Sequence, residues 1–77
     1  MTPTFTNAQR LVRAGAVLEV RLSPGETAYM RAEGFERGAH GMPDLTGSEM
    51  RVTGNDGFEP VPCSRLRASI RDIVRVW

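Results

Sequence analysis

The sequence contains no lysine, one cysteine, one histidine and only five aromatic residues. A single cysteine excludes an internal disulfide framework, and one cysteine with one histidine cannot supply the four ligands of a closed zinc site. No apolar run approaches the ~18 residues of a membrane span, and residues 1–16 lack the basic start and apolar centre of a secretory signal. These absences predict a cytoplasmic protein that contacts no membrane and holds no metal or cofactor.

Residues arranged for catalysis are also scarce. His40 follows Gly38 and Ala39 and could act as a base, but no residue pattern orients it towards the lone thiol of Cys63. Cys63 is predicted to be a small buried apolar side chain. Glu33 and Glu36 lack the apolar surroundings of a general acid and are expected to be solvated. The sequence therefore predicts that the protein is not an enzyme.

In place of lysine the sequence has ten arginines, and four of them fall in residues 64–77. The planar guanidinium group suits carboxylates, phosphates and aromatic faces. A GC-rich genome also favours arginine codons, so composition alone does not establish a function. The predicted partner-binding residues are this cluster together with the single tryptophan and the single histidine: Arg65, Arg67, Arg71, Arg75, Trp77 and His40.

The charge is unevenly distributed along the chain. Residues 1–15 carry a net +2, residues 16–63 a net −4 and residues 64–77 a net +3, which leaves +1 for the whole chain. A protein that binds DNA without sequence preference is usually strongly basic, because its affinity comes from neutralising phosphates. The acidic middle opposes such binding and favours a protein partner of mixed charge.

The N-terminal half shows a helical pattern and then a strand pattern. Thr6 and Gln9 have the spacing of a capping box, and Gly15 suits the position after a helix end, so a helix is expected over residues 7–14. From residue 16 the apolar period becomes two. This change predicts a strand, a turn at residues 23–26 and a returning strand over residues 27–32.

Residues 34–48 contain four glycines and a proline and are predicted to form a long mobile loop. A third strand is expected over residues 49–53 and a fourth over residues 58–62, where Pro60 and Pro62 indicate a sheet edge. The expected core consists of Leu18, Val20, Leu22, Met30, Met50, Val52, Phe58 and Val74.

Residues 64–77 allow two interpretations. Their apolar residues recur at helical spacing, whereas the stretch from Ile73 to Trp77 has the β-branched and aromatic composition of a strand. The favoured interpretation is a helical turn over residues 64–67 and a last strand from about Ile70. The alternative is one amphipathic helix packed on a four-stranded sheet.

The predicted fold is a single small domain over residues 1–77, mostly β within the α+β class. It has five antiparallel strands, in a barrel or a sheet, and a short N-terminal helix. This order resembles an SH3-like barrel, and residues 61–67 are similar to the turn before the last strand of such barrels. The resemblance covers about 60 residues without a family-specific motif, and a fold does not specify a function.

The function expected from these features is stoichiometric binding to a larger macromolecular partner, most readily a protein, which could itself belong to a nucleic-acid-handling complex. In size and composition the chain resembles small phage and mobile-element accessory proteins, including anti-CRISPR-type inhibitors. The alternative is a nucleic-acid-binding domain whose arginine stripe follows phosphates.

Overall fold

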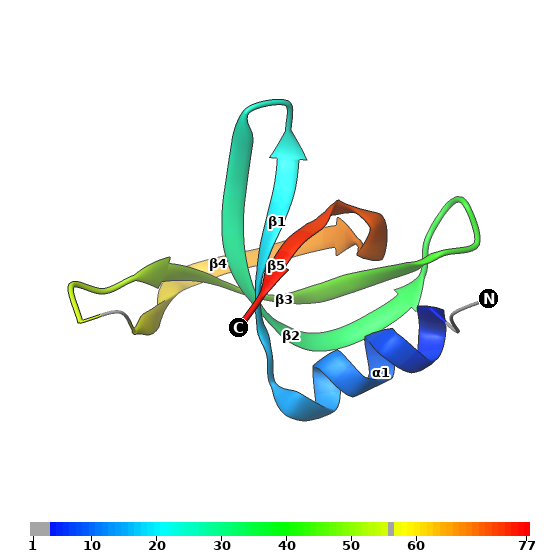
Figure 1. Ribbon diagram of the computed structural model, residues 1–77, viewed down its shortest axis with the longest axis horizontal. Coiled ribbons are helices and arrows are strands. Elements are labelled where there is room, and N and C mark those ends of the chain that lie inside the picture. The colour runs from blue at the N-terminus through cyan, green and yellow to red at the C-terminus, as the bar shows by residue number, and fades with distance from the viewer. Residues whose placement is uncertain (1–3, 56) are drawn as a thin grey trace.

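The computed structural model describes residues 4–55 and 57–77, which form one helix, one helical turn and five strands (Figure 1). The elements are α1 (Thr4–Ala14), β1 (Val17–Ser23), β2 (Glu26–Arg37), β3 (Pro43–Val52), β4 (Phe58–Ser69), η1 (Ile70–Asp72) and β5 (Ile73–Val76). All strands belong to one antiparallel sheet of order β4-β3-β2-β1-β5. The mostly β prediction is confirmed, but the sheet is not closed into a barrel. No helix among the described residues is long and apolar enough to cross a membrane.

The helix α1 begins three residues earlier than predicted, so Thr6 lies inside it instead of capping it. Its end is as expected. Gly15 adopts a φ of 60°, its N–H donates to the Val12 carbonyl, and the N–H of Ala16 donates to the Leu11 carbonyl. These two bonds form a Schellman motif, which satisfies the last carbonyls of the helix and turns the chain into β1.

The predicted long loop over residues 34–48 is wrong. β2 continues to Arg37 and β3 begins at Pro43, so only residues 38–42 connect them. Of the four glycines that suggested a loop, Gly34 and Gly47 lie within the strands, at a bend, whereas Gly38 and Gly41 lie in the connection. The register between β2 and β3 shifts between Ala32 and Gly34, and a Cβ on Gly47 would lie 1.7 Å from the Arg31 carbonyl oxygen. Glycine is needed there because the two backbones approach too closely for a side chain.

The C-terminal segment follows neither prediction in full. Residues 64–67 continue β4, and the helical turn comes later, at η1, where the Ser69 hydroxyl accepts a hydrogen bond from the N–H of Arg71. A last strand does exist, although it starts at Ile73, and a continuous helix is excluded. β5 then returns to pair with β1.

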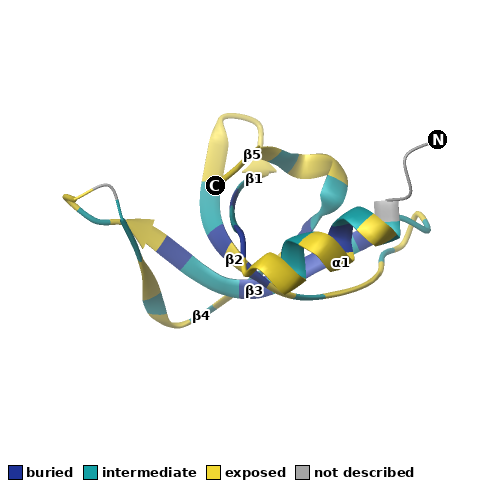
Figure 2. Cartoon of the chain, turned by 60° about the horizontal axis from the view of Figure 1, so that its bottom comes forward, coloured by how far each residue is buried: buried dark blue, intermediate teal, exposed yellow. Residues whose placement is uncertain are grey.

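The core lies between α1 and the bent sheet (Figure 2). Its buried members are Ala8, Ala16, Leu18, Val20, Met30, Ala32, Leu45 and Ala68. Half of them are alanines, which let the helix and strands approach closely. Leu18, Val20, Met30 and Met50 are buried as predicted.

Four core predictions do not hold. Leu22, Val52 and Val74 are 44%, 52% and 47% exposed, and Phe58 is only half-buried. Leu22 and Val52 are close to hairpin ends, and Val74 is in an edge strand, so nothing covers their outer sides. The alternation of apolar residues predicted which side chains of a strand face inward. It could not predict how far along the strand those side chains are buried by other elements.

Candidate functional site

The first two C-terminal arginines form ion pairs within the molecule. Arg65 and Arg67 project from β4 on the same side of the sheet as acidic residues of β2 and β3. The Nη1 of Arg65 lies 2.9 Å from Glu33 Oε1, and the Nε of Arg67 lies 3.0 Å from Asp44 Oδ2. Arg67 also pairs with Glu36. We call these five residues the ion-pair ladder.

Glu33 accepts hydrogen bonds from two side chains. The Ser48 hydroxyl donates a hydrogen bond to it at 2.8 Å, and Arg65 donates another. These two bonds, with the positive charges of Arg65 and Arg31, lower the pKa of Glu33 below the ordinary glutamate value of 4.5. Glu33 and Glu36 are both exposed to solvent, as predicted, and each is also paired with an arginine, which the sequence did not indicate.

The ladder explains the uneven charge of the sequence. β4 lies beside β3, and Ser48 stands opposite Arg65 while Thr46 stands opposite Arg67. This register brings arginines of the basic end against carboxylates of the acidic middle. Arg65 and Arg67 therefore have partners inside the fold, which leaves less of their charge for an external ligand.

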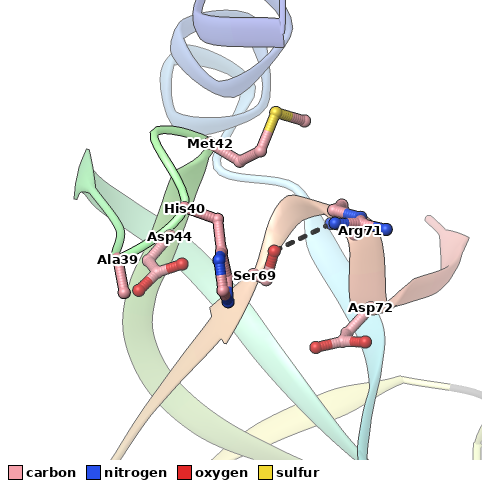
Figure 3. Close-up of a pocket in the computed structure, with 7 residues that line it drawn as sticks. All are labelled: Ala39, His40, Met42, Asp44, Ser69, Arg71 and Asp72. Carbon is pink, nitrogen blue, oxygen red and sulfur yellow. Dashed lines mark hydrogen bonds between the residues drawn. The ribbon is translucent and has the colours of Figure 1, made fainter.

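Arg71 and His40 meet at a shallow cavity of about 360 Å³ (Figure 3). The connection between β2 and β3 supplies Ala39, His40 and Met42, and the helical turn η1 supplies Arg71 and Asp72. Asp44 and Ser69 complete its lining. Two cationic or basic groups thus face two carboxylates, a mixed lining without a dominant charge. Among the described residues, no group of three or more His, Cys, Asp or Glu side chains could hold a metal ion.

Arg75 and Trp77 lie elsewhere, in a cluster of aromatic rings. Tyr29 and Phe58 have ring centroids 5.4 Å apart, and Trp77 lies 5.4 Å from Tyr29 and 5.5 Å from Phe58. The guanidinium carbon of Arg75 is 5.4 Å from the centre of the Trp77 ring, in a cation–π contact. We call Tyr29, Phe58, Arg75 and Trp77 the aromatic–arginine surface.

Strand pairing assembles this surface from three distant parts of the chain. Tyr29 faces away from the core because its neighbour Met30 faces into it. The N–H of Trp77 donates to the Val17 carbonyl at 2.9 Å, which fixes the chain after β5 beside β1. Met50, opposite Tyr29, is buried outside the main core cluster. Tyr29 and Phe58 are half-buried, and Trp77 remains 49% exposed.

The predicted partner-binding cluster included both Arg71 and Arg75, but the structure assigns Arg71 to the cavity and Arg75 to the aromatic–arginine surface. The strand starts at Ile73, so its alternation does not include Arg71. Tyr29 and Phe58 were missed as site residues. Tyr29 is the polar-tipped residue on the outward side of an alternating strand, which is a usable signal, whereas the position of Phe58 beside it depends on long-range register.

Cys63 is exposed, which contradicts the prediction of a buried thiol. Among the described non-glycine residues it alone has a positive φ, of 58°. It lies where the register between β3 and β4 shifts, with several β4 residues opposite Glu49. Such a bulge turns side chains of an edge strand away from the regular pattern.

Comparison with protein-family models, with curated proteins and with solved structures gives no match. The function must therefore be argued from these three surface features.

Proposed function

We propose that this protein is a non-enzymatic interaction module that docks on a larger protein through the aromatic–arginine surface. The observation that carries the proposal is the half-exposed Trp77, held by two other rings and contacted by Arg75. Tryptophan, tyrosine and arginine dominate the binding energy of protein interfaces. A rigid aromatic cluster loses little conformational entropy when a partner covers it.

One further observation supports this choice of surface. The ion pairs among the described residues use Arg51, Arg65 and Arg67, so Arg75 has no carboxylate partner within ion-pair distance there. A surface that combines exposed aromatic rings with such an arginine is suited to contact with a protein partner.

The biological role that fits best is that of a small cytoplasmic regulator or inhibitor acting by stoichiometric binding, of the kind carried by phages and mobile elements. This part of the proposal rests on size and composition. An SH3-like relationship is also proposed, because consecutive strands pair, β5 returns to β1, and a helical turn precedes β5. The cavity with His40 and Arg71 is a second place where the partner could contact the protein.

The second candidate function is nucleic-acid binding, and one observation favours it. Exposed aromatic rings beside arginine are the elements of surfaces that stack bases of single strands. Against it, the ion-pair ladder occupies Arg65 and Arg67, so the phosphate track predicted from the sequence is reduced to Arg71 and Arg75.

The test is affinity capture from the native host with the tagged chain, with and without nuclease treatment. We expect a protein to be recovered in stoichiometric amount after nuclease treatment, and to be lost with Arg75→Glu but retained with Arg10→Glu. Arg10 is a matched control because it is an exposed arginine of α1, which packs on β2 and β3. Recovery of nucleic acid alone would favour the second candidate.

A further inference from the structure

The sheet has two open edges, β4 and β5, which differ in the residues that would hinder the addition of another strand. Edge strands expose unpaired backbone groups to which another strand can add, and proteins block such addition with proline, bulges and charge. β4 carries Pro60 and Pro62, which lack an N–H, and Cys63 lies in a bulge with a positive φ. Its remaining length carries the arginines of the ion-pair ladder. β5 has no proline and one charged residue, Arg75, and its register shift lies towards its start, so that its end at Arg75 and Val76 pairs regularly with β1.

The backbone of β5 presents a free donor to its open side. The N–H of Trp77 points to β1, where it donates to the Val17 carbonyl. Successive N–H groups of a strand point to opposite sides. The N–H of Val76 therefore points away from β1, and no strand of the described residues lies on that side.

The side chains of β5 define the chemistry beside that donor. Val76 stands opposite Leu18 on the face that carries the core, and it is 50% exposed. Arg75 stands opposite Glu19 on the other face, next to Trp77. Glu19 accepts a hydrogen bond from Thr27 at 3.1 Å, while Arg75 lies over the Trp77 ring. One side of the edge is thus aliphatic and the other is cationic.

We infer that the open edge of β5 accepts an extended segment of a partner protein as a sixth strand, in which acidic and aliphatic residues alternate. Backbone hydrogen bonds supply affinity in such strand addition, and alternate side chains supply specificity. Acidic residues would lie beside Arg75 and aliphatic ones beside Val76. This inference rests on the proposed function for the source of the segment.

A second copy of the chain is a poorer occupant. Pairing of β5 with the β5 of another copy would bring two Arg75 side chains together on one face, and like charges across a strand pair are destabilising. Pairing with β4 of another copy would meet the prolines and the bulge at Cys63.

The test uses a synthetic seven-residue peptide of alternating valine and aspartate as the probe, with a valine–lysine peptide as its control. Binding is followed by the amide resonances of the labelled protein and by their hydrogen exchange. We expect the aspartate peptide to shift resonances of β5 and to slow exchange of the Val76 amide at least tenfold at saturation. The lysine peptide should bind at least tenfold more weakly.

Val76→Pro is the decisive variant, because it removes the outward N–H without breaking the bond between Trp77 and Val17. Proline is tolerated at an edge position whose N–H faces solvent. Val76→Thr keeps both the N–H and the β-branched shape, so it is the matched control. We expect Val76→Pro to lose peptide binding with an otherwise unchanged amide spectrum, and Val76→Thr to retain it.

Three outcomes of the peptide experiment would overturn the inference: no shift up to the solubility limit of the peptide, shifts confined to β4 or to the cavity, or equal binding by Val76→Pro. A concentration-dependent mass increase that Val76→Pro abolishes would show that a second copy occupies the edge, and would overturn the choice of a partner segment. These results do not depend on the host capture. Loss of a captured protein with Arg75→Glu but not with Val76→Pro would leave the proposed function intact and overturn strand addition alone.

Discussion

Gly47 shows how one residue without a side chain determines the shape of this sheet. Its backbone lies so close to that of β2 that an added Cβ would be 1.7 Å from the Arg31 carbonyl oxygen. This close approach coincides with the register shift at Gly34. Gly34 and Gly47 therefore serve strand packing, although the density of glycines along residues 34–48 is typical of a loop.

Gly47→Ala should destabilise the protein by about 3 kcal/mol or more, at or beyond the upper end of overpacking costs, because backbone cannot move aside as a flexible side chain can. Gly54→Ala is the matched control. A Cβ there has nothing within 4 Å, and its cost should stay within about 0.5 kcal/mol. Urea unfolding of both variants measures the difference. Equal midpoints for the two variants would show that the close approach at Gly47 is not a constraint.

Glu33 gives the fold an acid-sensitive contact. Because hydrogen bonds from Ser48 and Arg65 lower its folded-state pKa, its contribution to stability is present above the ordinary value and is lost as the pH falls through the folded-state pKa. Glu33→Gln should therefore make stability less dependent on pH in the acid range. Urea midpoints measured between about pH 6 and about pH 3 test this, with Glu26→Gln at the first hairpin turn as control. An unchanged pH profile for Glu33→Gln would contradict it.

At the scale of elements, the presence of a strand was easier to predict than the residues at which it begins and ends. Alternating apolar residues identified β1 and the first half of β2, and paired prolines identified β4 as an edge. The extension of β2 to Arg37 was missed because its second half pairs with β3, and that pairing depends on contacts distant in sequence. The helical spacing within residues 66–77 was coincidental, since the residues there belong to a strand end, a helical turn and another strand.

Leu18→Ala should cost about 2–5 kcal/mol of unfolding free energy, because Leu18 is fully buried in the central part of the core. Val52→Ala should cost about 0.5 kcal/mol or less, since half of that side chain already contacts solvent. Both were expected core residues, so the pair tests the burial that the structure assigns. Similar losses of stability in the two variants would contradict that assignment.

For the whole molecule, the fold class could be predicted from the sequence, but the different contacts that the C-terminal arginines make could not. Strand register decides that Arg65 and Arg67 meet Glu33, Glu36 and Asp44, that Arg71 lines the cavity with His40, and that Arg75 joins Trp77. A stripe of like charge in the sequence thus becomes three separate features on the surface.

The central claim is that the aromatic–arginine surface is the docking site for a protein, and the most direct measurement is the partner's affinity for Arg75→Glu and for Arg71→Glu over a range of salt concentrations. We predict that Arg75→Glu weakens binding by about 2 kcal/mol or more, as expected of an interface anchor, while Arg71→Glu has a smaller effect. Wild-type affinity should change little with salt, whereas phosphate binding would fall by about one log–log unit for each neutralised phosphate. Wild-type affinity in a folded Arg75→Glu variant would contradict the choice of surface, and a steep salt dependence would contradict the choice of a protein partner.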